Sequence, residues 1–201
     1  GSDGTPCHWW ICSVFESKTG ELLDLLRIHR PADHCYLIDE SWIPMRDRLL
    51  NRQRTGIDRL VAGWYVGSML GPELQADSPT GAGWVVVDAG SAVTVDWVDA
   101  TGCFRGGMIY PVWGLSARAL KVGTAALPEV QPPGSSGTLE ERQMSAATPK
   151  PLGRDTVAAI EAGLFWSQWG GLQETIRQQQ RLAVQESHAE SLSSNTANLI
   201  R

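Results

Sequence analysis

The sequence predicts a mixed α/β fold, because short apolar runs of strand length alternate with longer stretches of helical apolar spacing. The first part of the chain reads as a strand at 9–14, a helix at 22–28 and a strand at 35–38. Strand, helix, strand is the order that begins a layered α/β arrangement. Two later observations agree with this class: a set of three apolar strands separated by turn residues, and a series of helices after them.

The three later strands are expected to form an antiparallel meander. The run Trp84–Asp88 turns at Ala89–Ser91 into a strand at 92–98, and Asp99–Gly102 is a turn signal before a strand at 103–109. Strands that follow one another across such tight turns pair with their neighbours in the chain.

Three helices are predicted at 57–70, 115–127 and 155–170. Gly71 followed by proline ends the first, Pro128 ends the second, and Asp155 is a suitable N-cap for the third. The polar tail from 178 to 201 is expected to continue as helix and then fray.

Two domains are expected. A polar connector at 74–83, which contains glycine and proline, separates a domain at 1–80 from a second domain at 81–201. The stretch at 131–151 is rich in proline, glycine and serine, which predicts a mobile loop within the second domain.

Composition excludes several classes of function. The 201 residues are 42% hydrophobic and 19% charged, which is typical of a globular protein. A net charge of −5 gives no electrostatic footprint for nucleic acid. No apolar run approaches the roughly 18 residues of a membrane span. The four cysteines form no Cys-x-x-Cys pair, so we expect free thiols and a cytoplasmic location.

The first candidate site follows the apolar strand that ends at Asp88. Gly90 lets a backbone approach a ligand closely, while Ser91 and Thr94 supply hydroxyl groups. Exposed amides in such a turn can bind phosphates, and a carboxylate at a strand end can hold a cation. An ordinary β-hairpin with small turn residues is the alternative.

The second candidate site is Gly56-Ile57-Asp58-Arg59, at the start of a predicted helix. Asp58 is able to accept a proton from a substrate hydroxyl, and Arg59 is able to bind a carboxylate through two hydrogen bonds. The alternative is that Asp58 caps the helix and Arg59 is solvated.

Two weaker signals complete the set. The pair Gly106-Gly107 within a strand indicates either close approach of a ligand or a bulge. Thr156 lies near a helix N-terminus, where amides can bind anions, although capping alone also explains the motif.

Together these motifs resemble those of type III pantothenate kinases. The resemblance runs from about residue 10 to about residue 176 and follows the order TGIDR, DAGSAVTVD, GCFRGGMIYP, ALKVGTAALPEV and GRDT before AIEAG. It implies an actin-like (ribonuclease H-like) ATPase fold of two related domains and a homodimer. The implied activity is ATP-dependent phosphorylation of pantothenate to 4'-phosphopantothenate, the first step of coenzyme A biosynthesis.

The resemblance also implies roles for single residues. Asp58 matches the catalytic base, and Gly56 and Arg59 match positions that hold pantothenate. Thr156 matches a threonine that reaches the substrate from the partner protomer. Gly90, Ser91 and Thr94 match the second phosphate loop and are expected to bind the ATP phosphates. The acidic residue of this loop, Asp88, is expected to bind a monovalent cation (K⁺ or NH₄⁺). Mg²⁺ is expected to be used together with ATP.

The sequence departs from the family pattern at both ends. No Asp-x-Gly-Asn-Thr phosphate loop precedes Trp9, and nothing after Arg181 resembles the glycine-rich strand that faces adenosine. We therefore expect a chain shortened at both ends. Two alternatives to an active kinase remain open: an inactive binding or regulatory protein similar to the Bvg accessory factor group, and a gene fragment.

Overall fold

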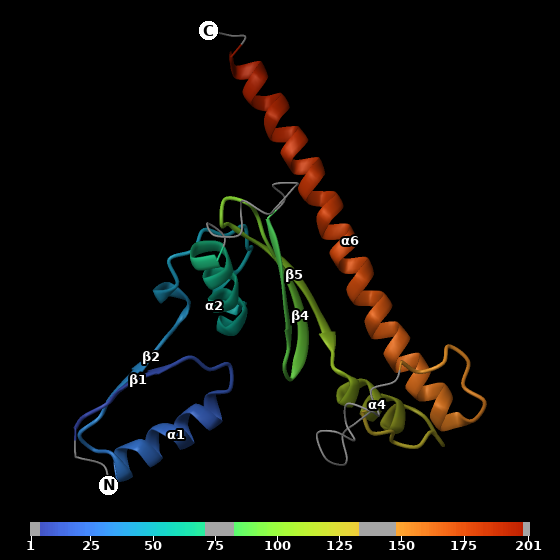
Figure 1. The fold of residues 1–201 in the computed structure, drawn as a ribbon. Coiled ribbons are helices and arrows are strands. Elements are labelled where there is room, and N and C mark those ends of the chain that lie inside the picture. The colour runs from blue at the N-terminus through green and yellow to red at the C-terminus, as the bar shows by residue number, and fades with distance from the viewer. Residues whose placement is uncertain (1–4, 71–82, 133–147, 199–201) are drawn as a thin grey trace. The chain divides into compact units, whose positions relative to one another are not determined.

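The computed structural model describes residues 5–70, 83–132 and 148–198 (Figure 1). Its contacts divide the chain into two compact units. Unit 1 comprises the chain up to Val86 together with Asp96–Gly106, and unit 2 comprises Val87–Val95 together with the chain from Gly107 onward. The predicted connector at 74–83 and the predicted loop at 131–151 fall mostly outside the described residues, and the domain boundary at 80 stays a prediction.

Unit 1 begins with the strand–helix–strand order that the sequence predicts. Strand β1 (His8–Ile11) and strand β2 (His34–Leu37) pair in parallel and are joined by helix α1 (Glu16–His29). In the register of the pair, His8 lies opposite His34 and Ile11 lies opposite Leu37. Parallel neighbours need a crossover of this kind, so the α/β class is confirmed.

An irregular segment follows β2 and is held by one arginine. It contains two short 3-10 turns, η1 (Glu40–Trp42) and η2 (Arg52–Arg54). The guanidinium of Arg52 donates to the carbonyl oxygens of Ile43 and Met45 at 2.6 and 2.8 Å, and it also pairs with Asp47. These bonds satisfy carbonyl groups that a helix or sheet would otherwise pair.

Helix α2 (Ile57–Tyr65) continues as a π-helical turn, η3 (Val66–Leu70), so the predicted helix at 57–70 is correct in extent but changes its winding. Ile57 and Leu60 point into the core of unit 1. The core also contains four buried residues from the irregular segment and the following sheet: Ile43, Met45, Val98 and Phe104. A Cβ atom at Gly63 would lie 2.7 Å from the Phe104 ring, so glycine allows α2 to approach that strand closely.

The predicted meander is confirmed. Strands β3 (Trp84–Ala89), β4 (Ala92–Val98) and β5 (Phe104–Pro111) pair in the order β3-β4-β5, and two-residue and five-residue turns join them. The boundaries of β4 agree with the prediction, whereas β5 is shifted toward Pro111. Residues of this sheet belong to both units, because the division between the units passes through all three strands.

Unit 2 is built on two helices. Helix α4 (Trp113–Gly123) packs on helix α6 (Thr156–Asn198) around four buried residues: Ala117, Val130, Ile160 and Leu164. Helix α6 is much longer than the predicted 155–170, because the residues after Gly171 are mostly glutamine, glutamate, arginine, alanine and leucine, which favour helix. In the described ranges no helix combines the length and apolar character that crossing a membrane requires.

Candidate active site

Asp58 lies in the first turn of α2, and its carboxylate is exposed. Its Oδ1 accepts a hydrogen bond from the backbone N–H of Arg59 at 2.9 Å. This bond orients the carboxylate relative to the first turn of the helix. A Cβ atom at Gly56 would lie 2.4 Å from this same oxygen. Glycine at position 56 therefore leaves the space that the carboxylate occupies.

Two residues of the loop after β1, Cys12 and Val14, lie near this carboxylate or the neighbouring Gly56. A Cβ atom at Gly56 would lie 3.8 Å from Val14 Cγ1. The pKa of the Cys12 thiol is raised, first by partial burial and second by the negative charge of Asp58. Cys12 and Val14 cannot be recognised as neighbours of the site from sequence patterns, because they lie more than forty positions away from Asp58 in the chain.

Arg59 is bound to an acid that the sequence analysis did not single out. Its Nε donates to Asp96 Oδ2 at 3.0 Å and to Oδ1 at 3.2 Å, and its Nη2 also donates to Oδ1. The guanidinium lies 5.9 Å from the centre of the Phe104 ring. The hydrogen bond to Asp96 raises the pKa of Arg59 above its ordinary value, with a smaller contribution from the charges of Asp96 and Asp58, so the residue is a fixed cation.

The turn after β3, which belongs to unit 2, is more exposed than the start of α2. The side chains of Asp88 and Ser91 are exposed, and Gly90 N–H donates to the carbonyl of Ala92 at 3.0 Å, which closes the turn. A Cβ atom at Gly90 would come no nearer than 3.9 Å to Asp88 Oδ2, so the space beside this glycine is free of close contacts. Thr94 differs from the others because it is buried within β4.

Of the glycine pair in β5, Gly106 has a φ of +98°, which side chains rarely adopt. The nearest atom to a Cβ there would be Leu49 Cδ2 at 3.8 Å, so crowding is not the reason for glycine. The requirement is one of backbone conformation, as the bulge interpretation predicts.

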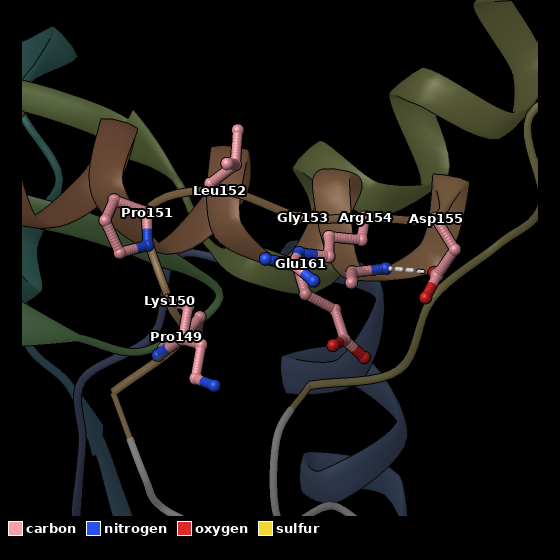
Figure 2. Close-up of a pocket in the computed structure, with 9 residues that line it drawn as sticks. Pro149, Lys150, Pro151, Leu152, Gly153, Arg154, Asp155 and Glu161 are labelled. Carbon is pink, nitrogen blue, oxygen red and sulfur yellow. Dashed lines mark hydrogen bonds between the residues drawn. The ribbon is translucent and has the colours of Figure 1, made fainter.

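Thr156 begins helix α6, and Asp155 caps that helix by accepting the N–H of Ala158 at 2.8 Å (Figure 2). The capping role predicted for Asp155 is therefore confirmed. A cavity of about 650 Å³ lies at this end of the helix, where Lys150, Arg154 and Glu161 line it with charges of both signs. Thr156 also lines a separate, mostly apolar groove of about 930 Å³ between α4 and α6.

The candidate residues fall into two groups. Gly56, Asp58 and Arg59 lie together in unit 1. The remaining residues belong to unit 2: Asp88, Gly90, Ser91, Thr94 and Thr156. The common cleft expected for Asp58 and the turn at Asp88 stays a prediction. Among the residues that the structure describes, no three histidine, cysteine or acidic side chains gather as a metal-binding cluster.

The fold and these groups define a class: a mixed α/β protein with an exposed carboxylate at a glycine-flanked helix start and a second acid before a hydroxyl-bearing turn. These are parts that phosphoryl transfer uses. The family model described as Type III pantothenate kinase matches residues 3–178, so the chain belongs to the type III pantothenate kinase family.

Curated relatives with the name type III pantothenate kinase agree with this membership. The chain is 35% identical to the protein from Paracoccus denitrificans over 134 residues, which cover 67% of the chain and 43% of the relative. It is 40% identical to the protein from Rhodopirellula baltica over 125 residues, which cover 62% and 39%. For Synechococcus sp. (strain JA-3-3Ab) the identity is 34%, covering 72% and 49%. The chain thus spans less than half the length of these relatives.

Proposed function

We propose that the chain acts as a pantothenate kinase and transfers the γ-phosphoryl group of ATP to the hydroxyl group of pantothenate. The products are 4'-phosphopantothenate and ADP, and the reaction is the first step of coenzyme A biosynthesis. The observation that carries the proposal is the carboxylate of Asp58, which is exposed at the start of α2 and oriented by the backbone of Arg59. Membership of the kinase family supports the same activity.

In the proposed reaction Asp58 accepts the proton of the pantothenate hydroxyl while the hydroxyl oxygen attacks the γ-phosphorus. A new P–O bond forms to pantothenate, and the bond from the γ-phosphorus to the bridging oxygen breaks, so that this oxygen leaves with ADP. A carboxylate suits this role when it lies within hydrogen-bond reach of the hydroxyl. Gly56 gives Asp58 the room that it needs, and Arg59 is the proposed partner of the pantothenate carboxylate.

The nucleotide is assigned to the turn after β3. Gly90, Ser91 and Thr94 are the proposed contacts of the ATP phosphates, and Asp88 is the proposed contact of a monovalent cation such as K⁺ or NH₄⁺. An exposed carboxylate near a strand end can serve as one ligand of a cation that takes its other ligands from phosphate and water. Mg²⁺, when bound with ATP, supplies neutralisation of the charge on the phosphates.

The wider architecture is also proposed from the family. It comprises an actin-like fold of two domains, a homodimer in which Thr156 of one protomer reaches the substrate of the other, and a cytoplasmic location. The mostly apolar groove between α4 and α6, which Thr156 lines, is the proposed place of this contact. The family model and the curated relatives named above give no support to the alternative of an inactive regulatory protein.

The test is ADP release from ATP in the presence of pantothenate, with and without potassium. Asp58→Asn should lower kcat by about 10²- to 10⁴-fold, which is the usual contribution of a general base. Asp24→Asn is the matched control, because Asp24 is an exposed acid on α1 that pairs with Arg27. A folded chain without pantothenate-dependent turnover, or equal loss in both variants, would contradict the proposal.

A further inference from the structure

Asp96 is an acid of the DAGSAVTVD motif for which the proposed reaction has no role. It lies on β4, and only 2% of its side chain is exposed, while 13% of the side chain of its partner Arg59 is exposed. Burying a carboxylate is costly unless it is paired and hydrogen-bonded. Both oxygens of Asp96 meet that condition through hydrogen bonds from Arg59.

The pair uses one particular edge of the guanidinium. A guanidinium has a side edge, formed by Nε and Nη2, and an end edge, formed by Nη1 and Nη2. Asp96 occupies the side edge. The hydrogen bonds to Asp96 use Nε and Nη2 and do not involve Nη1 of Arg59. The end edge is therefore the one that can still receive a second carboxylate.

We propose that Asp96 is a positioning residue for the substrate: it holds Arg59 by the side edge, so that the end edge receives the carboxylate of pantothenate. This inference rests on the proposed function and adds the residue that holds the proposed carboxylate-binding arginine in place. Asp96 touches neither substrate nor nucleotide and acts through Arg59. The Phe104 ring beneath the guanidinium limits its tilt and supports the same orientation.

Two effects of Asp96 oppose each other, and the experiment has to separate them. The acid orients Arg59, which favours binding of a carboxylate, and its negative charge repels that carboxylate. Without Asp96 the guanidinium would be largely buried and unpaired, so it would leave its place for solvent. We therefore expect orientation to outweigh repulsion. Asp96→Glu keeps the charge and moves the carboxylate by one methylene, so it changes orientation alone.

The test measures, by calorimetry, binding of pantothenate and of the alcohol in which a hydroxymethyl group replaces its carboxylate. The wild-type chain should prefer pantothenate by about 10- to 100-fold, the range expected for hydrogen bonds to a charged group. This preference should fall about tenfold in both Asp96→Glu and Asp96→Asn. Because partial unfolding lowers both affinities together, the ratio of the two reports on the carboxylate contact and not on stability.

Asp47→Asn is the matched control, since Asp47 is a half-buried acid in unit 1 that pairs with Arg52 outside the motif. Its preference for pantothenate should equal that of the wild type. An unchanged preference in Asp96→Glu and Asp96→Asn, or a stronger one, would overturn the role of Asp96 and leave the kinase proposal standing. Failure of the wild-type chain to bind either ligand would overturn the kinase proposal and this inference with it.

Discussion

Both units have an apolar core, but they differ in the burial of their ion pairs. In unit 1, acids on loops and strand ends are paired with arginines at four places: Asp33 with Arg30, Asp47 with Arg52, Asp96 with Arg59, and Asp99 with Arg105. Among the described residues of unit 2, the ion pair between Glu174 and Arg177 is exposed, and α4 packs on α6 through apolar side chains. In unit 1 the ion pairs hold irregular backbone in place beside an apolar core that includes Ile43 and Met45 of the same irregular segment.

The largest expected effect tests the arginine that holds the irregular segment of unit 1. Arg52→Ala removes the donor for the carbonyl groups of Ile43 and Met45 and leaves Asp47 unpaired. We expect the free energy of unfolding to fall by about 3 kcal/mol, the lower end for breaking a buried pair. Urea unfolding measures it. Arg177→Ala in unit 2 is the control and should change stability by less than about 0.5 kcal/mol. Equal effects would remove the distinction between the units.

The next effect tests the apolar packing of unit 2. Leu164→Ala deletes a buried side chain at the contact between α4 and α6, and it should cost about 2 to 3 kcal/mol of unfolding free energy. Leu152→Ala is the matched control, because that leucine is 74% exposed. Denaturant unfolding of both variants at low and high salt provides the measurement. A loss for Leu164→Ala that depends strongly on salt would contradict an apolar origin.

A smaller effect concerns the site in unit 1. Gly56→Ala places a methyl group where the Asp58 carboxylate lies, so the acid must move. Because small misplacements of a reacting group are costly, kcat for pantothenate phosphorylation should fall by about 10- to 100-fold. Gly20→Ala on α1 meets no atom within 4 Å and should leave kcat unchanged. If both variants kept full turnover, the space at position 56 would have no role in catalysis.

The pH dependence of stability sharpens the comparison further. The carboxyl group of Asp33 has its pKa lowered from 3.8 to about 2, first by the hydrogen bond from the Trp9 indole and then by that from Arg30. A group with a lowered folded pKa contributes its stability above pH 3.8 and loses it as the pH falls toward 2. Urea midpoints at several pH values should therefore fall less steeply for Asp33→Asn than for the wild type. Parallel curves would contradict this contribution.

The local structure was largely predictable from sequence, and the long-range pairs were not. Strand β4 and the turn after Asp88 were predicted because apolar runs and glycine turns are local signals. The ion pair between Arg59 and Asp96 was not predicted, because 37 positions separate the two residues. The local sequence around one of them carries no information about the other. The length of α6 was underestimated, since a polar helix carries little apolar periodicity.

The candidate site was predicted in the same uneven way. Motif order indicated Gly56, Asp58 and Arg59, and the structure brings these three residues together at the start of α2. It did not indicate that Thr94 would be buried within β4, because the two faces of a strand cannot be told apart when both carry apolar residues. Nor did it reveal that one sheet would contribute to both compact units.

Gly56 has an ordinary backbone conformation, with φ of −53° and ψ of 129°. Its backbone would accept other residues, and only the neighbouring acid stands in the way of a side chain. A chain that carries both Gly56→Ala and Asp58→Ala, in which the obstructing carboxylate is removed, is therefore expected to remain intact while losing its chemistry. Such a silent variant would allow substrate and nucleotide to be studied together without being consumed.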